Sequence, residues 1–301
     1  MTEQELHQRR RARWRVDGAR PVETIDAAAE FIAETGLCLE FPVKPWVVAP
    51  TWMGACAGTE ADLPLAAQAF RDPRLPRARE LKTRLLRQRT AFEVRYQGET
   101  NLLLSAEMFP FFYPLAGDRI PAREAASLGE KDKTSQLARD TFAVVQRKGP
   151  ISARRLQTEL GGEVSESSLA HALHQMWARL RVTRVDERED EGATWDVLHR
   201  WAPEAVEQGA AMSVPQGLSA LVSKYLDAVV AAEAAEIESF FAPMVARARV
   251  RETVNALLAA RQFSLIPAGR HTLVQNTPVE TLGAGKPMRP LAAQRRRSGG
   301  R

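Results

Sequence analysis

The sequence lacks most of the motifs that mark metal-dependent and nucleotide-driven enzymes. It contains only two cysteines, Cys38 and Cys56, which form no CxxC motif and have no histidine partner at zinc-site spacing. We therefore expect two reduced, mostly buried thiols rather than a disulfide or a reactive thiol. No HExxH motif or Ser/His/Asp signature is present, and Gly283–Lys286 lacks the spacing of a phosphate-binding P-loop. The sequence thus predicts no bound metal and no cofactor.

Long apolar runs are also missing. No uninterrupted apolar stretch reaches the roughly 20 residues that a membrane-spanning helix needs. The first residues, MTEQELHQRRRARWRV, are rich in arginine where a secretory signal has its apolar core. These features predict a cytoplasmic protein without a membrane partner, lying on the nucleoid in a cell that has no nucleus.

The positive charge of the chain is unevenly distributed. The formal net charge is +5 and the sequence pI is about 9.5, which is typical of nucleic-acid-binding proteins. However, residues 282–301 hold six basic residues and no acid, so the remaining 281 residues carry a net charge of −1. We expect 282–301 to be a disordered basic tail, and any phosphate-binding surface on the folded body to be a local patch.

The segment 135–202 has the order of a winged helix-turn-helix. Leu137, Thr141 and Val144 fall on one helical stripe, which Gly149-Pro150 ends. A second short helix and a third, from about Ser165 to Leu180, follow. Two short strands then flank a polar turn. The pattern predicts three helices and a two-stranded wing.

The same order recurs in the segment 215–275. Two apolar-striped helical stretches, 217–233 and 246–261, are separated by a short helix, and a small hairpin with a Pro-Ala-Gly-Arg turn follows. We therefore predict a mainly α protein with small β wings and tandem winged helix-turn-helix domains. The expected domains are an N-terminal helical domain at 1–130, winged helices at 135–202 and 215–275, and the tail at 282–301.

Candidate DNA contacts are basic and polar groups opposite the apolar stripes of these helices. In the second unit the last helix offers the strongest set, and the segment 71–95 adds nine Arg or Lys against three acids. The third helix of the first unit offers a weaker set. The candidates are Arg247, Arg249, Arg251 and Asn255 in the second unit, Arg84 and Arg87 in the basic segment, and His171, Gln175 and Arg179 in the first unit.

Each of these sets has a plainer interpretation. Arginines on a helix surface are often only solvated. The arginines of residues 9–15 are either such a solvated face or an arm that contacts phosphate. The turn of the first unit, DEREDEG, is acidic and would be repelled by phosphate, so this unit is either a DNA contact or a protein-binding module. His171 and His174 form a helical pair without a third metal ligand. The aromatic cluster at 107–114 fits a hydrophobic core better than a base-stacking platform.

Several segments resemble a known family of DNA-repair enzymes. An arginine-rich N-terminal helix precedes a helix that ends in Glu34-Thr35-Gly36-Leu37. The segments Leu103–Pro110 and Ala220–Leu226 are similar to the stretch after the family's first domain and to the opening of its last winged helix. On these residues the chain resembles the AlkZ/YcaQ-like group of bacterial DNA glycosylases that repair interstrand crosslinks. The resemblance implies a DNA-binding scaffold for base excision.

The catalytic motif of that family is absent. The family carries Gln-x-Gln or Gln-x-Asp just after its first helix and glycine, whereas the corresponding residues here are Gly36–Phe41, which include no glutamine. Cys38-x-Glu40 can occupy the motif in one register. A carboxylate there can orient a water or stabilise an oxocarbenium-like centre. Alternatively, Glu40 is an ordinary polar residue beside an apolar turn.

Two functional hypotheses follow from the sequence. The first is a protein that binds double-stranded DNA and is related to repair glycosylases, acting on alkylated or crosslinked bases if its departed motif is still active. The second is a non-enzymatic winged-helix transcriptional regulator or interaction scaffold, with a protein partner on the first unit. The scaffold alone does not decide between them, because function depends on the site.

Overall fold

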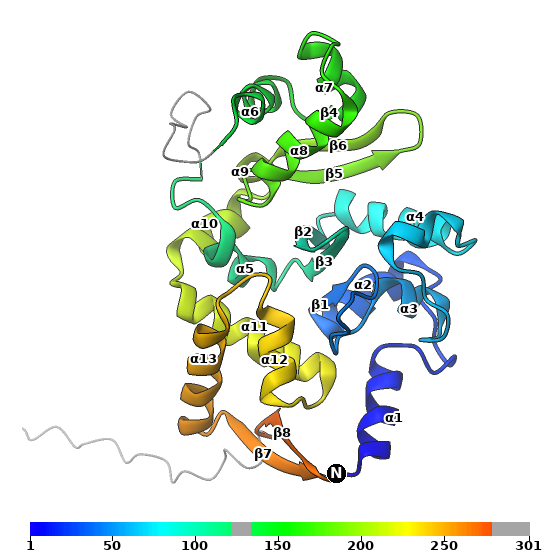
Figure 1. The fold of residues 1–301 in the computed structure, drawn as a ribbon, viewed down its shortest axis with the longest axis vertical. Coiled ribbons are helices and arrows are strands. Elements are labelled where there is room, and N and C mark those ends of the chain that lie inside the picture. Colours follow the sequence, from blue (N-terminus) through cyan, green and yellow to red (C-terminus); the bar gives the residue numbers. More distant parts are fainter. Residues whose placement is uncertain (122–133, 279–301) are drawn as a thin grey trace, which may run out of the picture.

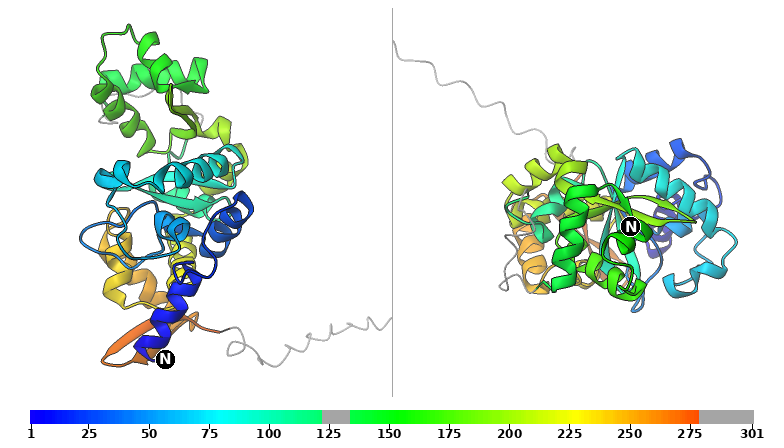
Figure 2. Two further views of the ribbon diagram at one scale, coloured as in Figure 1. Left: turned by 90° about the vertical axis from the view of Figure 1, so that its right-hand side faces the viewer. Right: turned by 90° about the horizontal axis from the view of Figure 1, so that it is seen from above.

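The structure is a computed structural model that describes residues 1–121 and 134–278. It is mainly helical with small antiparallel sheets, as predicted (Figure 1). The predicted tail at 282–301 lies outside the described residues. The described part is elongated: the segment 134–202 lies at one end, and the N-terminus and the last hairpin lie at the other (Figure 2).

The N-terminal region is built around a three-stranded sheet. Its elements are α1 (Glu3–Arg13), α2 (Ile25–Thr35), β1 (Leu37–Leu39), α3 (Trp52–Ala57), the 3-10 helix η1 (Ala66–Arg71), α4 (Leu75–Arg87), β2 (Ala91–Gln97), β3 (Thr100–Ser105) and α5 (Phe109–Ala116). The strands pair antiparallel in the order β1-β3-β2. Thr24 caps α2 through its hydroxyl, and Gly36 ends it at φ 72°, a left-handed conformation that glycine adopts without strain. The chain therefore turns directly from α2 into β1.

The segment 134–202 folds as three main helices, a small sheet and a final short helix. Its elements are α6 (Gln136–Lys148), β4 (Ile151–Ser152), α7 (Ala153–Glu159), α8 (Glu166–Trp177), β5 (Val182–Arg188), β6 (Gly192–Val197) and α9 (Leu198–Trp201). The sheet has the order β4-β6-β5. Each of the three main helices begins at a serine whose hydroxyl accepts a backbone N–H, at Ser135, Ser152 and Ser165. The predicted order of helices and hairpin is present.

The C-terminal part repeats this order. It comprises α10 (Pro203–Ala211), α11 (Val214–Val229), α12 (Ala234–Phe241), α13 (Arg247–Ala259), β7 (Phe263–Ala268) and β8 (His271–Asn276). Ala232, between α11 and α12, forms an antiparallel bridge with Val274 of β8. The hairpin therefore gains a third backbone partner at the place that β4 occupies in the preceding segment. The apolar stripe of α13, Val250, Val254 and Leu257, packs inward.

One hydrophobic core joins the N-terminal sheet to the C-terminal helices. It includes Phe109, Phe112 and Tyr113 of α5, together with Tyr225 of α11 and Phe240 of α12. The predicted aromatic cluster at 107–114 is therefore core. The rings of Tyr225 and Phe240 stack with centroids 4.5 Å apart. The N-terminal and C-terminal regions thus fold against each other, although residues 117–213 separate α5 from α11 in the sequence.

The basic start of the chain holds α1 against the end of α11. Arg10 donates to the carbonyl oxygens of Val229 and Ala231 at 2.9 and 2.6 Å, and Arg13 donates to that of Asp227. The indole of Trp14 donates to Ala228 at 2.8 Å. These carbonyls lie at the C-terminal end of a helix, where cations are favoured. These arginines are therefore neither simply solvated nor free to contact phosphate.

Candidate nucleic-acid interface

The outer face of α13 carries exposed arginines. Arg247, Arg249 and Asn255 are exposed, whereas Val250, Val254 and Leu257 of the same helix are buried. Within the described residues, neither the Arg247 nor the Arg249 guanidinium forms a hydrogen bond or an ion pair. Arg251 differs, because its Nε and NH2 atoms each donate to Glu238 at 2.8 Å. The predicted residues of α13 are therefore exposed, and one of the three arginines is already paired within the fold.

The basic helix α4 faces the acidic hairpin of the preceding segment. Arg87 donates to Asp186 of β5 at 2.5 Å, and Arg79 lies 3.9 Å from Glu187. Arg84, half-exposed, lies 3.8 Å from Glu80 on its own helix. The prediction treated α4 as a candidate for DNA and the hairpin as repelled by DNA. The structure brings these opposite charges together, so Arg87 would have to leave Asp186 to meet a phosphate.

The third helix of the first unit, α8, presents a weak polar face. His171 is exposed. The amide oxygen of the Gln175 side chain accepts a hydrogen bond from the backbone N–H of Ser135 at 3.1 Å, so part of its hydrogen-bonding capacity is used within the fold. Arg179 lies just beyond the helix and is half-buried. Of the three predicted residues, only His171 is fully presented to solvent.

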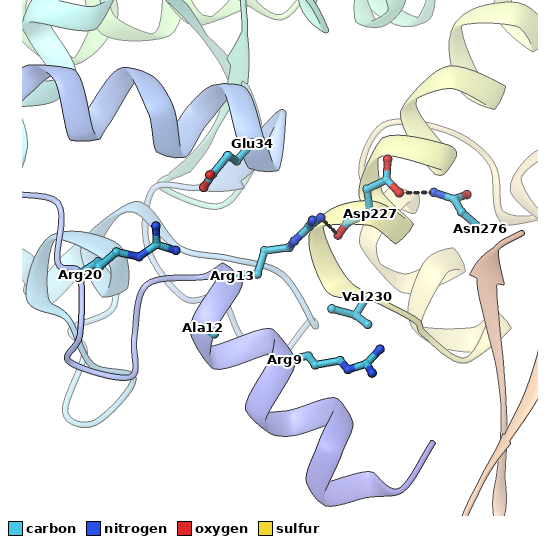
Figure 3. Close-up of a pocket in the computed structure, with 8 residues that line it drawn as sticks. All are labelled: Arg9, Ala12, Arg13, Arg20, Glu34, Asp227, Val230 and Asn276. Carbon is cyan, nitrogen blue, oxygen red and sulfur yellow. Dashed lines mark hydrogen bonds between the residues drawn. The ribbon is translucent and has the colours of Figure 1, made fainter. Parts of the chain in front are cut away.

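A cleft of about 610 Å³ lies between α1, α2 and the C-terminal unit. Figure 3 shows that its charged walls come from distant parts of the chain: Arg9 and Arg13 from α1, Glu34 from α2 and Asp227 from α11. Asn276 of β8 donates to the Asp227 carboxylate at 2.5 Å. The arginines of residues 9–15 were considered in sequence, but their grouping with Asp227 depends on the packing of α1 on α11.

Glu40, the candidate catalytic residue, lies in a network of buried charges. Its two carboxylate oxygens accept from Lys82 Nζ at 2.5 Å and from Asn101 Nδ2 at 3.0 Å. Lys82 also donates to Glu93 at 2.7 Å, and Arg184 of β5 lies 3.3 Å from the same carboxylate. The Glu40 side chain is 13% exposed, and Glu93 is fully buried. The network joins α4, the strands β2 and β3, the residue that follows β1, and β5.

The charges of this network balance each other. Burial by itself lowers the pKa of Lys82, but the carboxylates of Glu40 and Glu93 outweigh it and raise that pKa. Burial likewise raises the pKa of Glu93, yet Arg184, Lys82 and the hydrogen bonds from Lys82 and Asn101 together lower it to about 2. Lys82, Arg184 and Glu93 are therefore charged at neutral pH. These charges hold α4, the sheet and β5 together. Each carboxylate oxygen of Glu40 accepts one hydrogen bond within the network.

The described residues give no sign of a metal or a membrane segment. Within 1–121 and 134–278, no three His, Cys, Asp or Glu side chains are grouped as metal ligands would be. His171 and His174 accordingly have no third ligand there. No helix in the described part of the chain combines the length and the apolar character that crossing a bilayer requires.

Comparison with known proteins decides the family. The model of the family described as DNA glycosylase AlkZ-like matches residues 56–276. The chain belongs to the AlkZ-like family. The solved structure of Streptomyces sahachiroi DNA glycosylase AlkZ is similar in fold to this AlkZ-like chain, with a TM-score of 0.58 and 11% sequence identity. The similarity covers 92% of this chain and 70% of that one. No curated protein matches the chain.

The residues at the expected place of the family motif are mostly apolar and inaccessible in this AlkZ-like chain. Cys38 is fully buried in β1, and burial raises the pKa of its thiol well above the ordinary value. Its neighbours Leu39 and Phe41 are 1% and 6% exposed. Glu40 is the one polar side chain of the stretch Leu37–Phe41, and it is directed to Lys82. The chain is thus related to DNA-repair glycosylases without presenting a free motif side chain here.

Proposed function

We propose that the chain binds duplex DNA in a repair-related role and that α13 is the element that contacts the DNA. The exposed, unpaired guanidinium groups of Arg247 and Arg249 carry this proposal. Several other basic side chains are engaged within the fold: Arg10 and Arg13 donate to carbonyl oxygens of α11 and its end, and Arg87 donates to Asp186. An arginine without an internal partner can neutralise phosphate and release counterions without first breaking an ion pair.

The proposed contact also fits the element order of the C-terminal unit. A third helix followed by a hairpin is the order in which a winged helix presents its recognition helix. The bridge between Ala232 and Val274 supports this interpretation, because it supplies the short first strand of such a unit. We therefore interpret 214–276 and 135–202 as tandem winged helices. Arg247, Arg249 and Asn255 face the DNA in the C-terminal unit, while Arg251 remains paired with Glu238.

We further propose that Glu40 stabilises the fold and is not a base for glycosidic hydrolysis. A general base needs a free oxygen within reach of the water that it activates. Both oxygens of Glu40 instead accept hydrogen bonds from Lys82 and Asn101. Duplex binding without base release through Glu40 is the function that this geometry supports best.

A base-release assay on alkylated duplex tests this role of Glu40. We expect Glu40→Gln to bind duplex as the unchanged chain does and to leave any release of alkylated bases unchanged, while losing stability because Lys82 loses a charged partner. Release is measured as strand cleavage at the resulting abasic sites, at a temperature where unfolding curves show both proteins folded. Release by the unchanged chain that disappears in the folded variant would make Glu40 catalytic.

A further inference from the structure

The first helical unit has a cavity of its own, away from α13, and Arg184 in its wall also belongs to the network around Glu40. It lies between α7, α8 and the hairpin of β5 and β6, and its volume is about 590 Å³. α8 contributes Glu166, Leu169 and Leu173, and the hairpin contributes Glu189, Asp190 and Trp195. The cavity therefore has an apolar floor and an acidic rim.

The carboxylates of the rim are available to a ligand. Within the described residues, the side chains of Glu166, Glu189 and Asp190 form no hydrogen bond or ion pair. The guanidinium of Arg154 at the rim donates a hydrogen bond to the backbone carbonyl oxygen of Asp190 at 3.3 Å. Arg184, deeper in the cavity wall, is already balanced by Glu93 at 3.3 Å and Glu187 at 3.8 Å. The unbalanced charge at the opening is therefore negative.

His174 does not offset this negative charge. It lines the cavity at half-buried depth. Burial, and then the charges of Arg95, Arg184 and His171, lower its pKa to about 4. The imidazole is therefore neutral near pH 7, and it adds a polar but uncharged group to the wall.

The floor of the cavity is apolar. It is formed by Leu169, Ala170 and Leu173 of α8 and by Trp195 of β6, which is 3% exposed. An apolar floor beneath unpaired carboxylates suits a ligand that carries both apolar and cationic groups.

We propose that this cavity binds a cationic, amphipathic peptide segment of a partner protein. Lysine or arginine side chains of the segment pair with Glu166, Glu189 and Asp190, and its apolar side chains lie on the floor. Duplex DNA does not fit, because its phosphates would meet unpaired carboxylates. The first unit is thus a protein-binding module, while the C-terminal unit contacts DNA.

The test uses the full chain and a fluorescent probe peptide of about 14 residues, with leucine at helical core spacing and lysine elsewhere. A second probe has glutamine in place of every lysine. The rim variant is Glu166→Gln with Glu189→Gln and Asp190→Asn, three exposed residues without internal partners. The matched control is Glu60→Gln with Glu99→Gln and Glu207→Gln, which removes the same charge from exposed positions outside the cavity.

We expect saturable binding of the lysine probe by the unchanged chain and by the control, measured by fluorescence anisotropy. Binding of the lysine probe by the rim variant should be about tenfold weaker or more, and the glutamine probe should not bind. Equal binding of the lysine probe by the rim and control variants, or no saturable binding of that probe, would overturn the proposal. So would a parallel loss of duplex binding in the rim variant, which would make the cavity a DNA site.

Discussion

Replacing Arg247 and Arg249 with alanine should weaken binding to duplex DNA by about 10- to 100-fold at low salt. The two guanidinium groups are exposed and unpaired within the described residues, so their removal leaves no internal partner exposed. Each phosphate contact contributes about 0.9 to the slope of log K against log salt, so the slope should fall by about 2. Anisotropy with a labelled duplex across a salt series measures both quantities.

A matched variant separates a defined surface from general charge. Arg77→Ala with Arg188→Ala removes the same net charge from exposed residues that have acidic partners, Glu80 and Asp186. We expect that variant to change duplex binding by less than about threefold, because exposed ion pairs contribute little and lie away from α13. If both double variants weaken binding equally, the contact is not specific to α13.

Replacing Lys82 with methionine should lower the free energy of unfolding by about 3–5 kcal/mol. The change leaves the carboxylates of Glu40 and Glu93 facing each other without their common cation. Glu93 is fully buried, and only Arg184 remains to balance it. Urea unfolding followed by circular dichroism measures the loss.

The variant that combines Lys82→Met with Glu93→Gln provides the control. It removes one charge of each sign, so part of the lost stability should return relative to Lys82→Met alone. A loss below about 1 kcal/mol for Lys82→Met would show that the buried network does not hold α4, the sheet and β5 together.

The sequence predicted local structure well where apolar periodicity was strong. The stripes of α11 and α13 and the aromatic core at 107–114 are examples. The sequence did not predict α10, because residues 203–211 have no wide apolar face. That helix is stabilised by packing on α5 instead. Gly209 of α10 lies so close to Tyr113 that a Cβ there would come within 2.5 Å of its Cβ atom. Such a contact has no local sequence signal.

The buried network was only partly visible in the sequence. Lys82 stands next to Leu81 on a helix whose inward positions are otherwise mostly apolar, which hints at a buried charge. Its partners Glu40 and Glu93 come from other elements, 42 and 11 residues away along the chain. The contact between Arg87 and Asp186 joins residues 99 positions apart. Pairings of this kind depend on tertiary packing, so a basic segment and an acidic turn were each interpreted in isolation.

The central claim is that the folded body of the chain binds duplex DNA, independently of the six basic residues at 282–301. The most direct test is a salt series of duplex binding by a chain that ends at Pro278, beside the full chain. We predict that the shortened chain still binds, with an affinity that falls steeply as salt increases. Loss of binding on removal of 279–301 would contradict the claim and assign the basic character of the protein to that end alone.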